Sequence, residues 1–151
     1  MNDAGKKETI FGVPSPGSNI QAEGQTFSML KPEAIRSDFL QTFPFDSTQQ
    51  LIITETSEFT CVCPFSGLPD IAKLRIEYYP RGRRCIELKS LKYYITSYRN
   101  VGIYQEAVTH RIRKDLEKIL DCDVRVTTFY NTRGGFDTVC SEGKLKEGEN
   151  E

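Results

Sequence analysis

The chain of 151 residues is 38% hydrophobic, which is enough to bury the core of one ordinary domain. Its formal net charge of -1 and pI near 5.9 argue against direct binding of tRNA, DNA or a membrane surface, because the chain has no overall positive field. The odd number of cysteines, five, and a start without the apolar core of a signal peptide indicate a reducing, cytoplasmic location. No apolar run approaches the ~18 residues that suggest a membrane span.

Composition divides the chain into two tails and one domain. Residues 1–25 are rich in Gly, Pro, Ser and charged residues, which predicts a flexible tail, and residues 143–151 predict a second one. The single domain is placed at 26–142. Two prolines interrupt the short apolar clusters of 26–48, so no firm element is predicted there and the ordered fold is expected to begin near Gln49.

The apolar residues of the domain repeat with a period of two in some segments and of about 3.6 in others, which distinguishes strands from helices. The predicted elements, in chain order, are strands over 50–60 and 71–79, a short extended piece over 85–87, helices over 89–98 and 103–120, and strands over 123–131 and 136–140. This order predicts an α+β fold. A four-stranded antiparallel sheet with both helices on one face would bury the apolar stripes and leave the other sheet face for association.

The loop between the first two predicted strands contains Cys63, which is followed by a proline and then by Phe-Ser-Gly-Leu-Pro-Asp. A thiolate is a strong nucleophile, and loops held by a rigid scaffold collect functional groups, so Cys63 is a candidate catalytic residue. Asp70, at the end of this loop, is a candidate proton donor to an atom that gains charge. Taken singly, Cys63 is better explained as a small buried residue, and Asp70 can be explained as a turn cap.

The segment 87–94, Glu-Leu-Lys-Ser-Leu-Lys-Tyr-Tyr, lies at the predicted strand-to-helix junction. Helical positions three apart share one face, so Lys89 and Lys92 can converge on one polyanion, with Glu87 just outside that face. The Arg-Gly-Gly turn at 133–135 lets a backbone approach a phosphate while its arginine supplies several donors. A solvated helix face and a simple turn account for the same residues.

Metal and dinucleotide signatures are weak. Cys61 and Cys63 supply two soft donors, but the chain has only one histidine, His110, and no second closely spaced cysteine pair, so no metal site is predicted. The G-x-G-x-x-G signature after a first strand is also absent, so a nucleotide would not be held in the Rossmann manner.

Taken together, these segments resemble one family. The Cys-Pro-x-x-Gly-x-Pro-Asp loop, the segment 87–94, the Tyr-Arg-Asn helix end at 98–100 and the Arg-Gly-Gly turn occur in the order and spacing of the NADPH-dependent 7-cyano-7-deazaguanine reductases of queuosine biosynthesis, in their single-module form. The resemblance covers about 58–139. It implies the tunnelling fold shared with GTP cyclohydrolase I, in which the sheets of several subunits join into a barrel. It also implies a homo-oligomer, a decamer of two pentamers, with active sites at subunit boundaries.

The resemblance further implies a reaction and the residues that carry it. The nitrile of 7-cyano-7-deazaguanine (preQ0) would be reduced with two NADPH to the primary amine of 7-aminomethyl-7-deazaguanine (preQ1). Cys63 would form a covalent thioimide with the nitrile carbon, and Asp70 would donate the proton. The residues implied in substrate binding are Ile86, Glu87, Leu88, Gln105 and Glu106, and those implied in cofactor binding are Lys89, Ser90, Lys92, Arg133 and Gly134.

Gln105 departs from the family pattern, which usually has a histidine immediately before the substrate-binding glutamate. Glutamine donates and accepts hydrogen bonds but cannot carry a proton. We therefore expect Gln105 to keep a substrate contact and to weaken any proton-relay or electrostatic contribution at this position.

Three alternative functions are considered. A related amidinotransferase forms the thioimide on a nitrile-bearing tRNA and adds ammonia without NADPH; the intact segment 87–94 and the acidic pI argue against it. A zinc-dependent cyclohydrolase on the same fold needs a metal-bound water, which the poor ligand inventory does not support. A non-enzymatic oligomeric binding module would leave Cys63 with a purely structural role.

Overall fold

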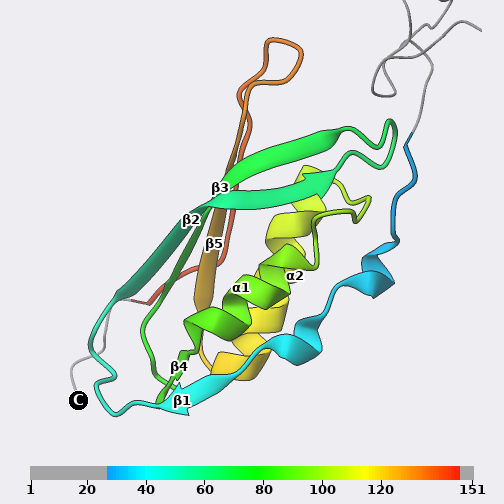
Figure 1. The fold of residues 1–151 in the computed structure, drawn as a ribbon. Helices are drawn as coiled ribbons and strands as arrows, with labels where there is room; N and C mark the ends of the chain where they lie inside the picture. The colour runs from blue at the N-terminus through cyan, green and yellow to red at the C-terminus, as the bar shows by residue number, and fades with distance from the viewer. Residues whose placement is uncertain (1–26, 147–151) are drawn as a thin grey trace, which may run out of the picture.

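One antiparallel sheet and two helices make up the body of the protein, which the computed structural model describes over residues 27–146. The strands are β2 (Ile52–Val62), β3 (Pro69–Tyr78), β5 (Val124–Tyr130) and β6 (Val139–Glu142), in the sheet order β2-β3-β5-β6. Helices α1 (Leu88–Thr96) and α2 (Gln105–Leu120) cover the same face of this sheet (Figure 1). The mixed α/β arrangement predicted from the sequence is therefore confirmed. The predicted tail at 1–25 lies outside the described residues, as does most of the predicted tail at 143–151.

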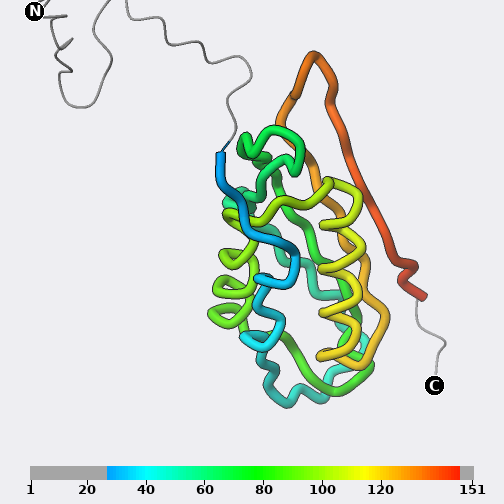
Figure 2. Tube along the Cα trace, turned by 90° about the vertical axis from the view of Figure 1, so that its right-hand side faces the viewer, coloured from blue at the N-terminus to red at the C-terminus, as the bar shows by residue number. Residues whose placement is uncertain are grey.

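The segment 27–44 holds ordered elements where the sequence predicted none, so the ordered fold begins well before Gln49. Two 3-10 helices, η1 (Pro32–Ala34) and η2 (Ser37–Phe39), lead into β1 (Thr42–Pro44), which pairs with β4 (Arg84–Ile86) as a separate two-stranded sheet. Figure 2 shows this segment running along the helices on the side away from the main sheet. Elements of three residues are too short to produce a readable hydrophobic period, which is why the prediction was wrong.

The last predicted strand is also shifted. The sequence placed it at 136–140, whereas β6 runs over Val139–Glu142. The difference arises because Arg133 and Phe136 exchange two backbone hydrogen bonds of 2.9 and 2.8 Å, which close a turn over the first part of the predicted strand. Gly134 and Gly135 adopt φ values of +55° and +82°, which residues with a side chain rarely do.

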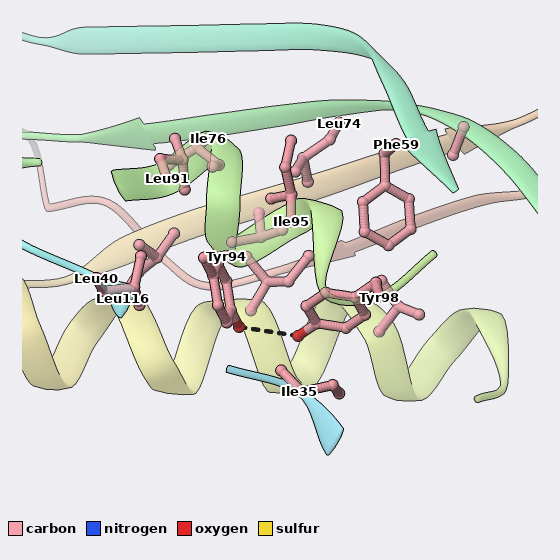
Figure 3. Close-up of a cluster of buried hydrophobic side chains, with 14 of the residues drawn as sticks. Ile35, Leu40, Phe59, Leu74, Ile76, Leu91, Tyr94, Ile95, Tyr98 and Leu116 are labelled. Atoms are coloured by element: carbon pink, nitrogen blue, oxygen red, sulfur yellow. Dashed lines mark hydrogen bonds between the residues drawn. The ribbon is translucent and has the colours of Figure 1, made fainter. Parts of the chain in front are cut away.

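The core lies between the sheet and the helices. On β3 every second residue points inward, and Ala72, Leu74 and Ile76 are each 1% exposed. Figure 3 shows Tyr94 and Tyr98 of the α1 region packed into this layer with their hydroxyls hydrogen-bonded at 2.8 Å. The helix residues that complete the core are Leu91 and Ile95, together with Val108, Ile112, Leu116 and Leu120. Burial of one such aliphatic side chain contributes about 1.5–3 kcal/mol, so the two apolar stripes hold the helices on the sheet.

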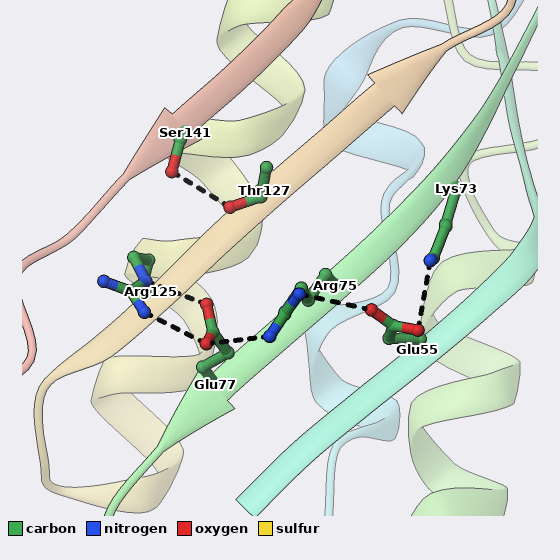
Figure 4. Close-up of polar contacts among 7 residues, drawn as sticks. All are labelled: Glu55, Lys73, Arg75, Glu77, Arg125, Thr127 and Ser141. Atoms are coloured by element: carbon green, nitrogen blue, oxygen red, sulfur yellow. Dashed lines mark hydrogen bonds and ion pairs between the residues drawn. The ribbon is translucent and has the colours of Figure 1, made fainter.

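A ladder of charged residues crosses the opposite face of the sheet (Figure 4). The Arg125 guanidinium donates to both carboxylate oxygens of Glu77, at 2.8 and 3.0 Å, and Arg75 lies 3.4 Å from the same carboxylate. Glu55 continues the ladder to Lys73 at 3.1 Å. The hydrogen bonds from Arg125 outweigh the effect of burial and lower the pKa of Glu77. This face is polar but internally paired, so the expectation that it serves association stays a prediction.

Within the described part of the chain, no helix combines the length and the apolar character needed to cross a membrane. The cytoplasmic location expected from the sequence stays a prediction.

We expect Glu77→Gln to lower the free energy of unfolding by about 1.5–3 kcal/mol at pH 7, the range for a lost hydrogen bond to a charged group. Because the pKa of Glu77 is lower in the folded than in the unfolded state, its contribution is present above the unfolded pKa and is lost as the pH falls through the folded value. Urea unfolding at pH 7 and at acidic pH, at one protein concentration, measures the difference.

Glu58→Gln is the matched control, because Glu58 is an exposed carboxylate of β2 without an ion pair among the described residues. Its effect should stay within about 0.5 kcal/mol. A loss for Glu77→Gln that is equal at every pH would contradict the ion-pair interpretation.

Candidate active site

Cys63 stands at the exit of β2, where the chain turns back towards β3. The turn is closed by the Cys63 N–H, which donates to the Leu68 carbonyl at 2.9 Å, and by the Gly67 N–H, which donates to the Cys63 carbonyl at 2.7 Å. Gly67 has φ +72°, and a Cβ at this position would lie 2.8 Å from the Phe27 carbonyl oxygen, so only glycine fits without displacement. The loop therefore holds Cys63 in one backbone position.

A short parallel bridge ties this strand exit to the connection between the two helices. The Val62 N–H donates to the Val101 carbonyl at 3.0 Å, and the Ile103 N–H donates to the Val62 carbonyl at 3.2 Å. Two residues after Ile103, helix α2 begins with Gln105. The bridge thus places the start of α2 beside the loop that carries Cys63.

The surroundings of Cys63 favour its thiolate. Partial burial works against the charged form, but the backbone N–H groups of Ser66 and Phe65, the Ser66 hydroxyl and the Arg133 guanidinium outweigh it, so the pKa of Cys63 is lowered. The neighbouring Cys61 is fully buried, and burial together with the charge of Asp70 raises its pKa to about 12. Of these two thiols, only Cys63 has a lowered pKa, which favours the nucleophilic thiolate.

Asp70 is the first inward-facing residue of β3 and is 2% exposed. It lies directly across the sheet from Cys61 in the β2–β3 register. The Arg133 guanidinium donates to its carboxylate from the turn between β5 and β6. Burial raises the pKa of Asp70, and the charge of Arg133 opposes this increase only in part. A carboxyl group whose pKa is raised near a nucleophile is suited to carry a proton.

Gln105 and Glu106 form the first turn of α2. The Gln105 carbonyl accepts a hydrogen bond of 3.3 Å from the Tyr130 hydroxyl, which links the helix start to the end of β5. Glu106 is exposed, and its carboxylate has no hydrogen bond or ion pair to another described residue. Both predicted substrate residues therefore stand at the same end of the molecule as Cys63 and Asp70.

The other predicted binding residues gather at the start of α1. Glu87 is the N-cap of this helix: its carboxylate accepts from the Lys89 N–H at 2.9 Å and from the Ser90 N–H at 2.7 Å. Lys89 and Lys92 are exposed and have no ion pair within residues 27–146. The Ser90 hydroxyl is buried, donates to the Glu87 carbonyl at 2.7 Å and accepts from the Gln41 N–H at 2.9 Å. Its predicted cofactor contact stays a prediction.

Ile86, Glu87 and Leu88 border a mostly apolar cavity of about 500 Å³. Phe43 and Phe45, from the segment that sequence analysis left without structure, line its other side. The cavity is large enough for a small heterocycle. The carboxylate at its edge, that of Glu87, already accepts hydrogen bonds from the first N–H groups of α1.

The structure therefore separates the predicted site residues into two groups. Cys63, Asp70 and Arg133 lie where β2 ends, whereas Glu87 and Lys89 lie where α1 begins. Helix α1 rises by about 1.5 Å per residue over nine residues, and the bridge at Val62 follows its far end, so more than ~13 Å separates the groups along its axis. One chain does not bring its predicted cofactor lysines to its own Cys63.

Sequence reasoning missed two features of this site. Ser66, three residues after Cys63, supplies both a backbone and a side-chain hydrogen bond to the thiol; a serine inside a tight loop was the available signal. Arg133 was assigned to the cofactor alone, whereas its guanidinium donates to Asp70 and is among the groups that lower the pKa of Cys63. No spacing in the sequence predicts that contact, because 63 residues separate Arg133 from Asp70.

The possible Cys-x-Cys metal pair does not recruit further ligands. Residues 27–146 contain no group of three or more His, Cys, Asp or Glu side chains arranged to hold a metal ion.

Comparisons with known proteins identify relatives of this chain. Residues 69–149 match the family described as QueF-like protein. The chain is 54% identical over 127 residues to the NADPH-dependent 7-cyano-7-deazaguanine reductases of Thermotoga petrophila and Thermotoga maritima, an alignment that covers 83% of this chain and 93% of each relative. It is 44% identical over 115 residues to the reductase of the same name from Caldicellulosiruptor bescii, covering 74% of this chain and 87% of that one.

A solved structure also matches. The archaeosine synthase QueF-Like in its apo form aligns with a TM-score of 0.57, covering 66% of this chain and 96% of that chain. At 23% identity this likeness shows the fold alone.

The fold and the site define a mixed α/β protein with one cysteine of lowered pKa near a buried carboxyl group. Within that class, the chain belongs to the QueF-like family of proteins. The resemblance noted in the sequence is thereby confirmed.

We expect Glu87→Gln to lower the free energy of unfolding by about 0.5–1 kcal/mol, because the amide has one acceptor oxygen instead of two and loses the favourable charge at the helix N-terminus. Thermal unfolding without substrate measures this effect separately from ligand binding. Glu106→Gln is the control, since this carboxylate caps no N–H group, and its effect should be smaller. Equal melting temperatures for Glu87→Gln and the native protein would contradict the capping role.

Proposed function

We propose that this chain is an NADPH-dependent reductase that converts the nitrile of 7-cyano-7-deazaguanine (preQ0) to the primary amine of preQ1, in the biosynthesis of queuosine. The reductases that are 54% identical to it over most of their length support the reaction. The observation that carries the mechanism is the Cys63 thiol of lowered pKa beside the buried Asp70, whose pKa is raised.

The covalent step uses these two side chains. The Cys63 thiolate attacks the nitrile carbon, a C–S bond forms, and one π pair of the C≡N bond moves to nitrogen. Asp70 delivers a proton to that nitrogen, which gives a neutral thioimide. Because Asp70 is 2% exposed, its proton reaches the substrate rather than bulk water. The attack splits a difficult reduction into easier steps.

Two NADPH, bound in succession, would each supply one hydride, so that four electrons reach the substrate. Lys89 and Lys92, exposed and unpaired within residues 27–146, would fit the cofactor phosphates at the first two turns of α1. An added Cβ at Gly134 would meet no atom within 4 Å, so the backbone there is open to a ligand. Arg133 would add donors, and Ser90 would fix the helix start through Gln41.

Two copies of the chain would complete one site. The Cys63 end and the α1 end lie apart in a single chain, so a neighbouring chain would present Ile86, Glu87 and Leu88 to the base held at Gln105 and Glu106. This arrangement agrees with the tunnelling fold, in which sheets join into a barrel, and with a decamer of two pentamers. It treats the substrate as the free base, without direct tRNA binding.

The amidinotransferase remains the second candidate. Its structural likeness to this chain supports only a shared fold, at 23% identity. The exposed lysines at the start of α1 favour the reductase, because an ammonia-dependent reaction does not need a site for cofactor phosphates.

Intact-mass spectrometry with preQ0 and without NADPH tests the covalent step. The native chain should gain the mass of one substrate, and Cys63→Ala should gain none and oxidise no NADPH. Cys61→Ala, which removes the buried thiol two residues away, should still form the adduct. An adduct that survives Cys63→Ala, or no adduct on the native chain, would overturn the mechanism. An adduct without NADPH oxidation would favour the amidinotransferase.

Gln105→His restores the histidine that the family usually has at this position and tests what the glutamine changes. A histidine can carry a proton where glutamine cannot, so single-turnover hydride transfer should accelerate by about tenfold, below the ~10²–10⁴-fold range of full general acid–base catalysis. The KM for preQ0 should change little, because both side chains form hydrogen bonds. Gln105→Met, which forms none, should raise the KM. An unchanged hydride-transfer rate in Gln105→His would refute a chemical role for this position.

A further inference from the structure

Arg133 lies beside both side chains of the proposed covalent step. Its guanidinium donates to the Asp70 carboxylate. Asp70 is the strand partner of Cys61, two residues before Cys63, and the Arg133 guanidinium is among the groups that lower the pKa of Cys63. The fork of a guanidinium has five N–H donors, so it can serve both groups at once. The family resemblance assigned this residue to the cofactor alone, which accounts for neither role.

We propose that Arg133 takes part in the chemistry at Cys63: its guanidinium stabilises the thiolate and orients the Asp70 carboxyl group beside it. The consequence for the nitrile rests on the proposed function, whereas the contact with the thiol does not depend on it.

The proton balance of the covalent step agrees with this role. The S–H proton passes to the Asp70 carboxylate, the C–S bond forms, and Asp70 then transfers the same proton to the nitrile nitrogen. No outside acid, base or oxidant is required. Arg133 keeps its charge throughout, because a guanidinium does not lose its proton in proteins. One fixed cation therefore offsets the negative charge as it moves from the carboxylate to sulfur and back.

The turn that carries Arg133 is built to hold it in place. The residue is anchored by two backbone hydrogen bonds to Phe136, and the Asn131 N–H donates to the Ile71 carbonyl at 2.9 Å, one residue beyond Asp70. The Arg133 side chain is 48% exposed while its partner carboxylate is 2% exposed. The guanidinium thus reaches from solvent to the only buried carboxylate of this end of β3.

Cys61 provides an internal comparison. It faces Asp70 directly in the strand register, and burial raises its pKa to about 12 although the charge of Arg133 opposes the increase. For Cys63 the hydrogen bonds, including that from Arg133, outweigh burial and the pKa is lowered. Both thiols are read in the same sample when fragment-ion sequencing localises the alkyl group within the peptide that contains them.

The test is site-resolved alkylation of the full chain by iodoacetamide between pH 5 and 9, without substrate or cofactor. In Arg133→Gln the titration of Cys63 should move to higher pH by about one unit, so that its rate at pH 7 falls about tenfold. Arg133→Lys keeps the charge but loses the fork, so its rate should fall by a smaller factor. Arg81→Gln, the same charge change at an exposed turn, should leave the profile unchanged.

A Cys63 profile in Arg133→Gln that superimposes on the native profile would overturn the proposal. Should that variant fail to fold, Arg133→Lys, which retains the pair with Asp70, decides the question: an unchanged Cys63 rate at pH 7 would overturn it equally. Thermal unfolding shows whether Arg133→Gln is folded and hence whether Arg133→Lys is needed in its place.

A second measurement separates this proposal from the proposed function. The rate of adduct formation with preQ0, without NADPH, should fall in Arg133→Gln by the same factor at pH 7 and approach the native rate at high pH, where the thiol is fully ionised. A shifted alkylation profile with no adduct on any variant would sink the nitrile chemistry and uphold the role of Arg133 at the thiol.

Discussion

Two backbone hydrogen bonds at Val62 hold the reactive end of the molecule in place. They tie the last residue of β2 to the chain between α1 and α2, on either side of Gly102. Because of this bridge, Cys63 lies beside the start of α2. The bridge also fixes the position of the two helices along the strands of the sheet. The packing of the two apolar stripes and the position of the nucleophile thus depend on the same short contact.

The buried carboxyl group of Asp70 is the second constraint on this end. The other inward residues of β3 are apolar, and a buried carboxylate without a partner would cost several kcal/mol. The Arg133 fork from the neighbouring hairpin offsets that cost and keeps the turn close to Cys63. A chain with a net charge of -1 therefore creates one locally positive position next to a thiol, and long-range charge has no part in it.

The predicted site residues lie at two ends of the molecule, one where β2 ends and the other where α1 begins. Segment 87–94 begins a helix as expected, with Glu87 serving as its cap and two lysines exposed on its first two turns. The same segment is far from Cys63 in its own chain. In the proposed assembly each chain contributes a nucleophile to one site and a helix start to the next, so oligomerisation and catalysis become one requirement.

Long elements were predictable from the sequence because alternation along β2, β3 and β5 and the helical stripes of α1 and α2 extend over seven or more residues. The candidates Cys63 and Asp70, and the family, followed from loop chemistry and from the order of four motifs. Three features were not predictable from the sequence: the elements of segment 27–44, the start of β6, and the effect of Arg133 on Cys63. Short elements carry no hydrophobic period, and an effect between side chains 70 positions apart has no local signal. The sequence by itself determined the long elements and the family, and it nominated the residues proposed to carry the chemistry. Only the tertiary structure decided which of them meet, because strand pairing and the bridge at Val62 set those distances.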